Sequence, residues 1–312
     1  MISFRYHLVT VVAVFLALGL GVVAGTTVVD QGLVSRLQEQ TGNANRSAEL
    51  ARDRAGELGS QLSRTTGLID QVLPLLTAGK LDGNQMVVVT DDGADAAMID
   101  SVTKLVSESG GDVTAVLSLT DAAAVDDAKS REELATLLEV SQASSSEDLQ
   151  AEMASQLATR LAEGVHGEQD RLFQLLEAGF LEAGQGNGPQ KVNGQLPDVG
   201  GPAQSVIVVS GGVGTPPVQP SSFIEPLVGD LVDQGAYVVA AEPGSAAYPF
   251  VSDIRDSGLN DSGAMVTVDD ADEPAGEYTL VEALGSLLRG EGGGDYGFKS
   301  GATDGLFPPL AR

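Results

Sequence analysis

LVTVVAVFLALGLGVVAGTTVV, residues 8–29, is a run of 22 residues without a charged side chain, in a chain of 312 residues that is otherwise acidic. A helix of about 20 apolar residues crosses the hydrocarbon core of a bilayer. The flank before the run holds Arg5, and the flank after it begins with Asp30. By the positive-inside rule, residues 1–7 stay in the cytoplasm and the remainder lies on the other side. The run therefore predicts a single-pass protein of the cytoplasmic membrane with an extracytoplasmic body.

The alternative for this run is a cleaved signal peptide, since Val22, Val23 and Ala24 would suit a small-residue cleavage site. The run exceeds the about 7–15 residues of a signal-peptide core. Small side chains also recur every four residues and share one helix face: Ala13, Ala17, Gly21 and Gly25. Such a face allows two membrane helices to approach closely. We therefore favour a retained anchor that dimerises.

An alternating spacing of four and three residues continues after the anchor. Its positions are Leu37, Thr41, Ala44, Ala48, Ala51, Ala55, Leu58, Leu62, Thr65, Ile69, Val72 and Leu76. Most residues between them are polar or charged, which is typical of a coiled-coil seam. We expect residues 30–80 to form a stalk that pairs as a parallel homodimer and is closed by Pro74 and Gly79. The alternative is one helix that folds back on its own body.

Short valine-rich runs alternate with helical patterns over residues 84–290. The expected strands are Met86–Thr90, Val113–Leu119, a run that begins at Ser205, Ala236–Glu242 and Ala264–Asp270. Helices are expected up to Ser109, over 130–140, 146–164 and 168–182, around Phe223–Gln234, and over Tyr278–Arg289. Strands of this composition are buried on both faces, so the pattern predicts an α/β domain with a mostly parallel, Rossmann-like sheet. We expect a helical insertion over 120–182, a linker over 183–203 and a flexible tail over 291–312.

Charge and composition exclude several classes of function. The formal net charge is −27, and residues 81–312 carry 38 acidic and 10 basic side chains. Such a body repels nucleic acid, whose binding depends on lysine and arginine. The chain has no cysteine, so it has neither a disulfide nor a thiolate metal site.

Acidic side chains follow the first and last expected strands. Asp91, Asp92 and Asp95 follow the first, and Asp269 and Asp270 follow the last, with Asp272 and Glu273 close behind. Carboxylates at strand ends are candidate ligands for a hard divalent cation. In so acidic a chain, solvated loop carboxylates are the alternative.

Other candidate chemistry is sparse. Residues 206–214, VIVVSGGVG, resemble a strand that enters a phosphate-binding glycine turn, but they lack GxGxxG and a following lysine. The turn Ser210–Gly214 is therefore a candidate small-ligand site, with a plain connection as the alternative. His7 lies beside the membrane and His166 near a helix end, so they cannot share a site. The sequence holds no GxSxG motif, and we expect neither an enzyme nor a cofactor.

The opening MISFRYHLVTVVAVFLALGLGVVAG, the alanine-rich stalk, and the later runs MVVVTDDG, SVIVVSGG and AYVVAAEP resemble the actinobacterial MctB family, which carries the label "copper transporter". The resemblance covers the whole architecture and implies copper transport or homeostasis. Copper is the only bound metal that the resemblance implies. Corynebacterial relatives of this family are linked to envelope integrity and division, alongside a cytoplasmic partner.

Three functions remain open from the sequence. The leading interpretation is a non-enzymatic membrane-anchored homodimer that links a cytoplasmic or membrane partner to envelope biogenesis or cell division, as a scaffold or signalling partner. The second is the copper homeostasis that the family label implies. The third is an extracytoplasmic sensor that binds a small ligand at Ser210–Gly214.

Overall fold

The structure is a computed structural model that describes residues 4–28, 30–167, 169–184, 192–202, 204–212, 214–261 and 263–308. Within these ranges, the side chains of residues 4, 26–28, 30–35, 37 and 70 are not described. The chain divides into two units, one up to Gly67 and one from Leu68 onward.

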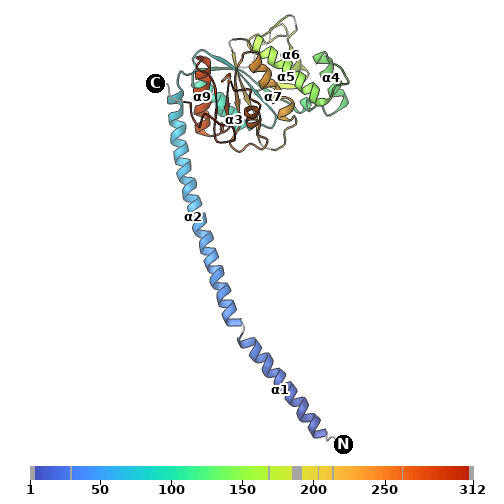
Figure 1. The fold of residues 1–312 in the computed structure, drawn as a ribbon, viewed down its shortest axis with the longest axis vertical. Helices are drawn as coiled ribbons and strands as arrows, with labels where there is room; N and C mark the ends of the chain where they lie inside the picture. The colour runs from blue at the N-terminus through green and yellow to red at the C-terminus, as the bar shows by residue number, and fades with distance from the viewer. Residues whose placement is uncertain are drawn as a thin grey trace. The chain divides into compact units, whose positions relative to one another are not determined.

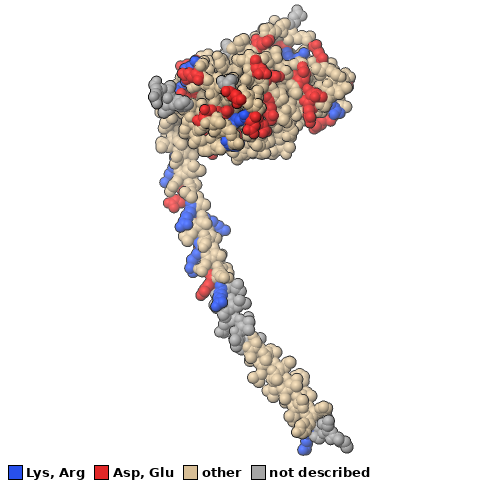
Figure 2. All heavy atoms as spheres, in the orientation of Figure 1, with Lys and Arg blue, Asp and Glu red and all other residues tan. Residues whose placement is uncertain are grey.

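The first unit is helical throughout its described part (Figure 1). Helix α1 spans Phe4–Val28, and its stretch Arg5–Gly25 is long and apolar enough to cross a membrane, with a mean hydropathy of 2.6 over its most apolar window. Figure 2 shows most of α1 without a charged side chain. This confirms the predicted N-terminal apolar helix.

Helix α2 spans Asp30–Thr77 and covers most of the predicted stalk. Pro74 lies inside it, so the helix continues for three residues beyond the proline, and Gly79 follows with a φ of +72°. A left-handed φ favours glycine, which suits a helix-terminating turn. The coiled coil and the homodimer stay predictions.

The second unit is built around a seven-stranded sheet in the order β3-β2-β1-β4-β5-β6-β7. Its strands are β1 (Gln85–Thr90), β2 (Asp112–Leu119), β3 (Leu181–Ala183), β4 (Gln204–Val209), β5 (Tyr237–Ala241), β6 (Met265–Val268) and β7 (Gly294–Tyr296). All neighbouring pairs are parallel except β2 with β3. This confirms the mixed α/β class and the mostly parallel sheet.

Helices cover both faces of the sheet, which gives three layers. One face packs on α5 (Ser146–Glu163) and α7 (Ile224–Asp233), and α4 (Ala128–Leu138), α6 (Arg171–Glu177) and α8 (Val251–Asp256) complete that layer. The other face packs on α3 (Ala96–Glu108) and α9 (Pro274–Leu288). Short 3₁₀ turns span Asp121–Ala124 and Pro220–Ser222. Strand β1 shows why both faces are apolar: Val87 and Val89 point into one core and Met86 and Val88 into the other.

The region 120–182 differs from the predicted insertion. Leu149, Met153, Leu157 and Leu161 of α5 are fully buried against the sheet, so α5 is part of the helical layer itself. The predicted helix over 168–182 is wrong in extent, because α6 ends at Glu177 and β3 follows as an antiparallel edge strand. Phe180 and Leu181 are buried at this edge and continue the apolar spacing of α6.

The segments predicted as linker and tail are also tied to the core where the structure describes them. In the linker, residues 185–191 and 203 lie outside the described residues, whereas Leu196 and Val199 are fully buried. The predicted flexible tail contains β7, which pairs with β6, and Tyr296 is 5% exposed. The tail therefore supplies the edge strand of the sheet with Gly294–Tyr296.

Candidate functional site

The carboxyl ends of β1 and β4 form the topological switch point of the sheet. These two strands are neighbours, and the connections that leave them run toward opposite edges of the sheet. In open α/β sheets, ligands bind outside the strand ends at such a switch point. Asp91 follows β1, and Ser210 follows β4.

The switch point is filled by the protein's own polar groups. The Ser210 hydroxyl donates to Asp91 Oδ2, and the Tyr248 hydroxyl donates to Asp91 Oδ1 at 2.9 Å. Asp91 is only 3% exposed, and this burial raises its pKa despite the two hydrogen bonds. Burial, followed by the charge of Asp91, raises the pKa of Tyr248 as well. A ligand at this position would have to displace the Tyr248 ring.

The glycine turn after β4 packs against the turn after β1. A side chain at Gly212 would overlap the backbone of Gly93 and Ala94, and one at Gly93 would overlap the Tyr248 hydroxyl. Val213 lies outside the described residues. The described part of Ser210–Gly214 therefore closes the crevice, which is a poor geometry for the predicted phosphate-like cradle.

A second polar cluster lies at the carboxyl ends of β5 and β6. Glu242 is fully buried and accepts from the backbone N–H groups of Phe250 and Val251 at 2.7 and 3.1 Å, and from Lys299 Nζ at 2.8 Å. Asp269 is fully buried and accepts from Arg255 Nη1 at 2.6 Å. Each buried carboxylate thus has a cation, which offsets the cost of its burial.

Asp270 differs from its neighbour, because no other described residue donates a hydrogen bond to either of its carboxylate oxygens. The residue is 2% exposed and lies against Gly276 in the first turn of α9, where a side chain would overlap Asp270. Burial, then the charges of Asp269, Asp272 and Glu273, raise the pKa of Asp270 to about 6. A substantial fraction of Asp270 therefore keeps its proton in mildly acidic solution.

The acidic residues predicted as metal ligands are dispersed by the fold. Asp95 caps α3 by accepting from the Ala97 N–H at 2.8 Å, and Asp92 is exposed. β4 and β5 separate β1 from β6, so the two acidic sets lie about 14 Å apart at normal strand spacing. Among the described residues, no group of three histidine or acidic side chains is placed to hold a metal ion. The hard-cation site therefore has no support beyond the sequence pattern.

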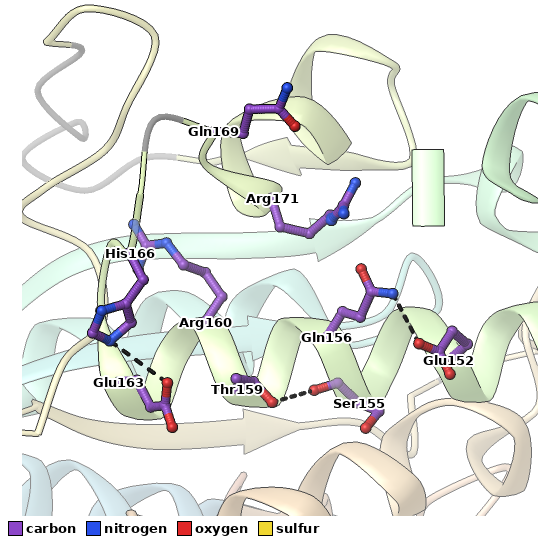
Figure 3. Close-up of a pocket in the computed structure, with 10 residues that line it drawn as sticks. Glu152, Ser155, Gln156, Thr159, Arg160, Glu163, His166, Gln169 and Arg171 are labelled. Atoms are coloured by element: carbon purple, nitrogen blue, oxygen red, sulfur yellow. Dashed lines mark hydrogen bonds and ion pairs between the residues drawn. The ribbon is translucent and has the colours of Figure 1, made fainter. Parts of the chain in front are cut away.

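A groove lined by polar side chains runs along α5, on its side toward the segment that leads into α6 (Figure 3). Its volume is about 420 Å³. The side chains that line it include Ser155, Gln156, Thr159, Arg160, Glu163, His166, Gln169 and Arg171. His166 Nε2 lies 3.5 Å from Glu163 Oε2, and both side chains are more than half exposed. Sequence reasoning placed His166 on the surface and missed its pairing with Glu163, although the spacing of three residues at a helix end was visible.

Comparison with known proteins covers nearly the whole chain. Residues 1–307 match the family described as "Copper transport outer membrane protein, MctB". The chain belongs to the MctB family. Relatives named "Copper transporter MctB" occur in Mycobacterium tuberculosis and Mycobacterium bovis, each 28% identical over 311 residues, and these alignments cover 97% of this chain and 98% of the relative. The relative of the same name in Mycobacterium leprae is 26% identical over 324 residues, with the same coverage.

The MctB match and the apolar α1 are together consistent with a membrane-anchored protein. The predicted small-residue face lies within α1, and added side chains at Gly21 and Gly25 would meet no described atom within 4 Å. On α2, the seam residues Leu58, Leu62 and Leu76 are more than half exposed. The side chain of Leu37 lies outside the described part. The pairing of these surfaces with a second copy of this MctB-family chain stays a prediction.

Proposed function

We propose that this chain is a single-pass membrane protein whose α/β body works outside the cytoplasm in copper homeostasis. The observation that carries the proposal is the match of residues 1–307 to a copper transport family, including the apolar helix. Arg5 before that helix and Asp30 after it support an extracytoplasmic body. The face of the body in Figure 2 carries more acidic than basic side chains, and such a surface attracts metal cations.

The chain would act as an accessory to copper movement and not as the conduit. A conduit through a bilayer needs a ring of spanning segments around it, and the described residues offer one candidate spanning helix. A copper path would then require several copies or a separate membrane partner. We further propose that the body is not an enzyme, because the polar groups at the strand ends already bond within the protein. Asp91 accepts from Ser210 and Tyr248, and Glu242 accepts from Lys299.

The test is a deletion strain grown across graded copper, with cell-associated copper measured by mass spectrometry. We expect lower copper tolerance and a changed copper content, both restored by the full chain. A version with α1 replaced by a cleavable signal peptide is the matched control, and it should restore neither. Copper tolerance and content equal to the parent strain would refute the proposed function.

A second candidate function is a scaffold for envelope biogenesis or cell division. The observation that favours it is the exposed apolar row on α2, where Leu58 and Leu62 are 65% and 67% exposed. Apolar residues at heptad spacing pair with a second helix, and a membrane anchor raises the local concentration of that partner. We propose a parallel homodimer that presents two bodies and two N-termini to partners. Cell shape, scored in the same cultures, separates the two functions, because a scaffold defect would deform cells without added copper.

A further inference from the structure

The α/β body offers few accessible sulfur or imidazole ligands for copper. The chain has no cysteine and two histidines. Met86, Met98, Met153 and Met265 are each at most 2% exposed, so their thioethers are enclosed in the core. His7 lies in α1, whereas the side chain of His166 is 69% exposed in the body. His166 is therefore the accessible imidazole of the α/β body.

His166 lies at a position that favours a cation. Glu163 is the last residue of α5, an 18-residue helix, and its carboxylate is 3.5 Å from His166 Nε2. The C-terminus of a helix carries partial negative charge, which stabilises cations within the last turn. Imidazole nitrogen and carboxylate oxygen together are ligands that copper(II) accepts. Copper(II), which needs no thiolate, thus suits this pair better than copper(I).

The pair also has space around it. Glu163 and His166 line the groove of Figure 3, and they line a second hollow of about 410 Å³ that Gln204, Gln234 and Ala236 also border. An ion held by the pair can therefore complete its coordination with water from either side. Such an ion remains exchangeable, because two protein ligands on an open surface do not enclose it.

The cations near the pair are already bound to other groups. Arg160 forms a bidentate pair with Asp170 at 2.8 and 3.1 Å and donates to the carbonyls of Leu196 and Val199. Arg171 donates to the Leu137 carbonyl and to the Gln174 side chain. The Arg160 charge is thus neutralised by Asp170, which lowers the repulsion of a bound metal ion.

We propose that Glu163 and His166 bind one exchangeable copper(II) ion at the C-terminus of α5. The inference deepens the proposed copper function and rests on it for the identity of the metal. The imidazole nitrogen donates its lone pair to the ion, and the Glu163 carboxylate supplies the second protein ligand. The ion leaves for a copper-moving partner without a change in its oxidation state.

The experiment uses the full chain in detergent with less than one equivalent of copper(II), in a buffer of glycine that competes for loosely held metal. Pulsed EPR detects the remote nitrogen of a copper-bound imidazole. We expect this signature in the wild type and in His7→Gln, and its loss in His166→Gln. Glu163→Gln should keep the signature and weaken the affinity by at least about tenfold, because the loss of a ligand should cost no less than the loss of an outer-shell partner.

An imidazole signature that persists in His166→Gln, or that is absent from the wild type, overturns the site. Gel-filtration volume and circular dichroism of His166→Gln, on an exposed side chain, verify that the variant is folded. The outcome is separable from the growth test. A copper-sensitive deletion strain with no His166-dependent signature keeps the function and removes the site, whereas a copper-tolerant strain with the signature keeps the site and removes the function.

Discussion

Replacing Asp270 by asparagine should change how the stability of the body depends on pH. Asp270 is 2% exposed, and no other described residue donates a hydrogen bond to its carboxylate. Its pKa is raised to about 6, first by burial and then by Asp269, Asp272 and Glu273. Because the amide of asparagine does not titrate, Asp270→Asn removes this contribution while keeping a side chain of nearly the same shape.

The direction and size of the effect follow from the pKa in the two states. The native pKa of about 6 exceeds the unfolded value of 3.8, so the native state holds the proton more tightly. The wild type therefore loses stability as the pH rises from about 4 to about 6, and the loss stays constant above that. A difference of about two units, at 1.36 kcal/mol per unit, gives an upper limit of about 3 kcal/mol. Relative to the wild type, Asp270→Asn should gain up to this amount between pH 4 and pH 7.

The assay is urea unfolding of the full chain in detergent at pH values from 4 to 8. Unfolding is followed by pulse proteolysis and by tyrosine emission, since the chain has five tyrosines and no tryptophan. The readout is the change with pH in the difference between variant and wild type, which removes any pH-independent cost of the amide. Glu132→Gln, on the exposed side of α4, is the control and should show a change below about 0.5 kcal/mol. Parallel stability curves for Asp270→Asn and wild type would refute the reasoning.

Three further changes test the core, the stalk and the switch point. Leu157→Ala, in the fully buried row of α5, should cost about 2–5 kcal/mol in urea unfolding, and a cost below about 1 kcal/mol would contradict the packing of α5 on the sheet. Leu58→Cys should form a disulfide dimer in membranes, whereas Ser60→Cys on the opposite helix face should not, and equal crosslinking would contradict the seam. Tyr248→Phe removes a 2.9 Å hydrogen bond to Asp91 and should destabilise the body by about 1–3 kcal/mol, and an unchanged urea midpoint would show that water replaces the hydroxyl.

The central strands were predictable because they are apolar on both faces. Runs such as Met86–Thr90 and Ala236–Glu242 must be enclosed wherever they lie, so composition alone indicates a sandwiched parallel sheet. The α6–β3 region was not predictable in the same way. Phe180 continues the helical spacing of Leu172 and Leu176, and its burial at the sheet edge depends on pairing with β2.

The candidate sites depended on tertiary contacts even more strongly. The sequence identified Asp91 and Asp269 as candidate metal ligands but did not indicate what they bind. Their partners, Tyr248 and Arg255, are distant in the chain and lie beside them only in the folded body. The isolation of Asp270 arises from close packing on Gly276, which no local pattern encodes. The sequence shows Glu163 and His166 three residues apart at the end of a helix. Only the structure shows that they line two hollows, which leave room for an ion and its water ligands.

The position of β7 at the edge of the sheet has a consequence for synthesis. Met265–Val268 emerges from the ribosome well before Gly294–Tyr296. Until β7 is made, the backbone groups on the outer edge of β6 lack their partner strand. An open strand edge is a template for pairing with another chain. The same delay between β6 and β7 would occur if the body crosses a membrane as an unfolded chain, starting from its N-terminus. A chain truncated before Gly294 would keep that edge permanently, so expression designs for this protein should retain the residues through Tyr296.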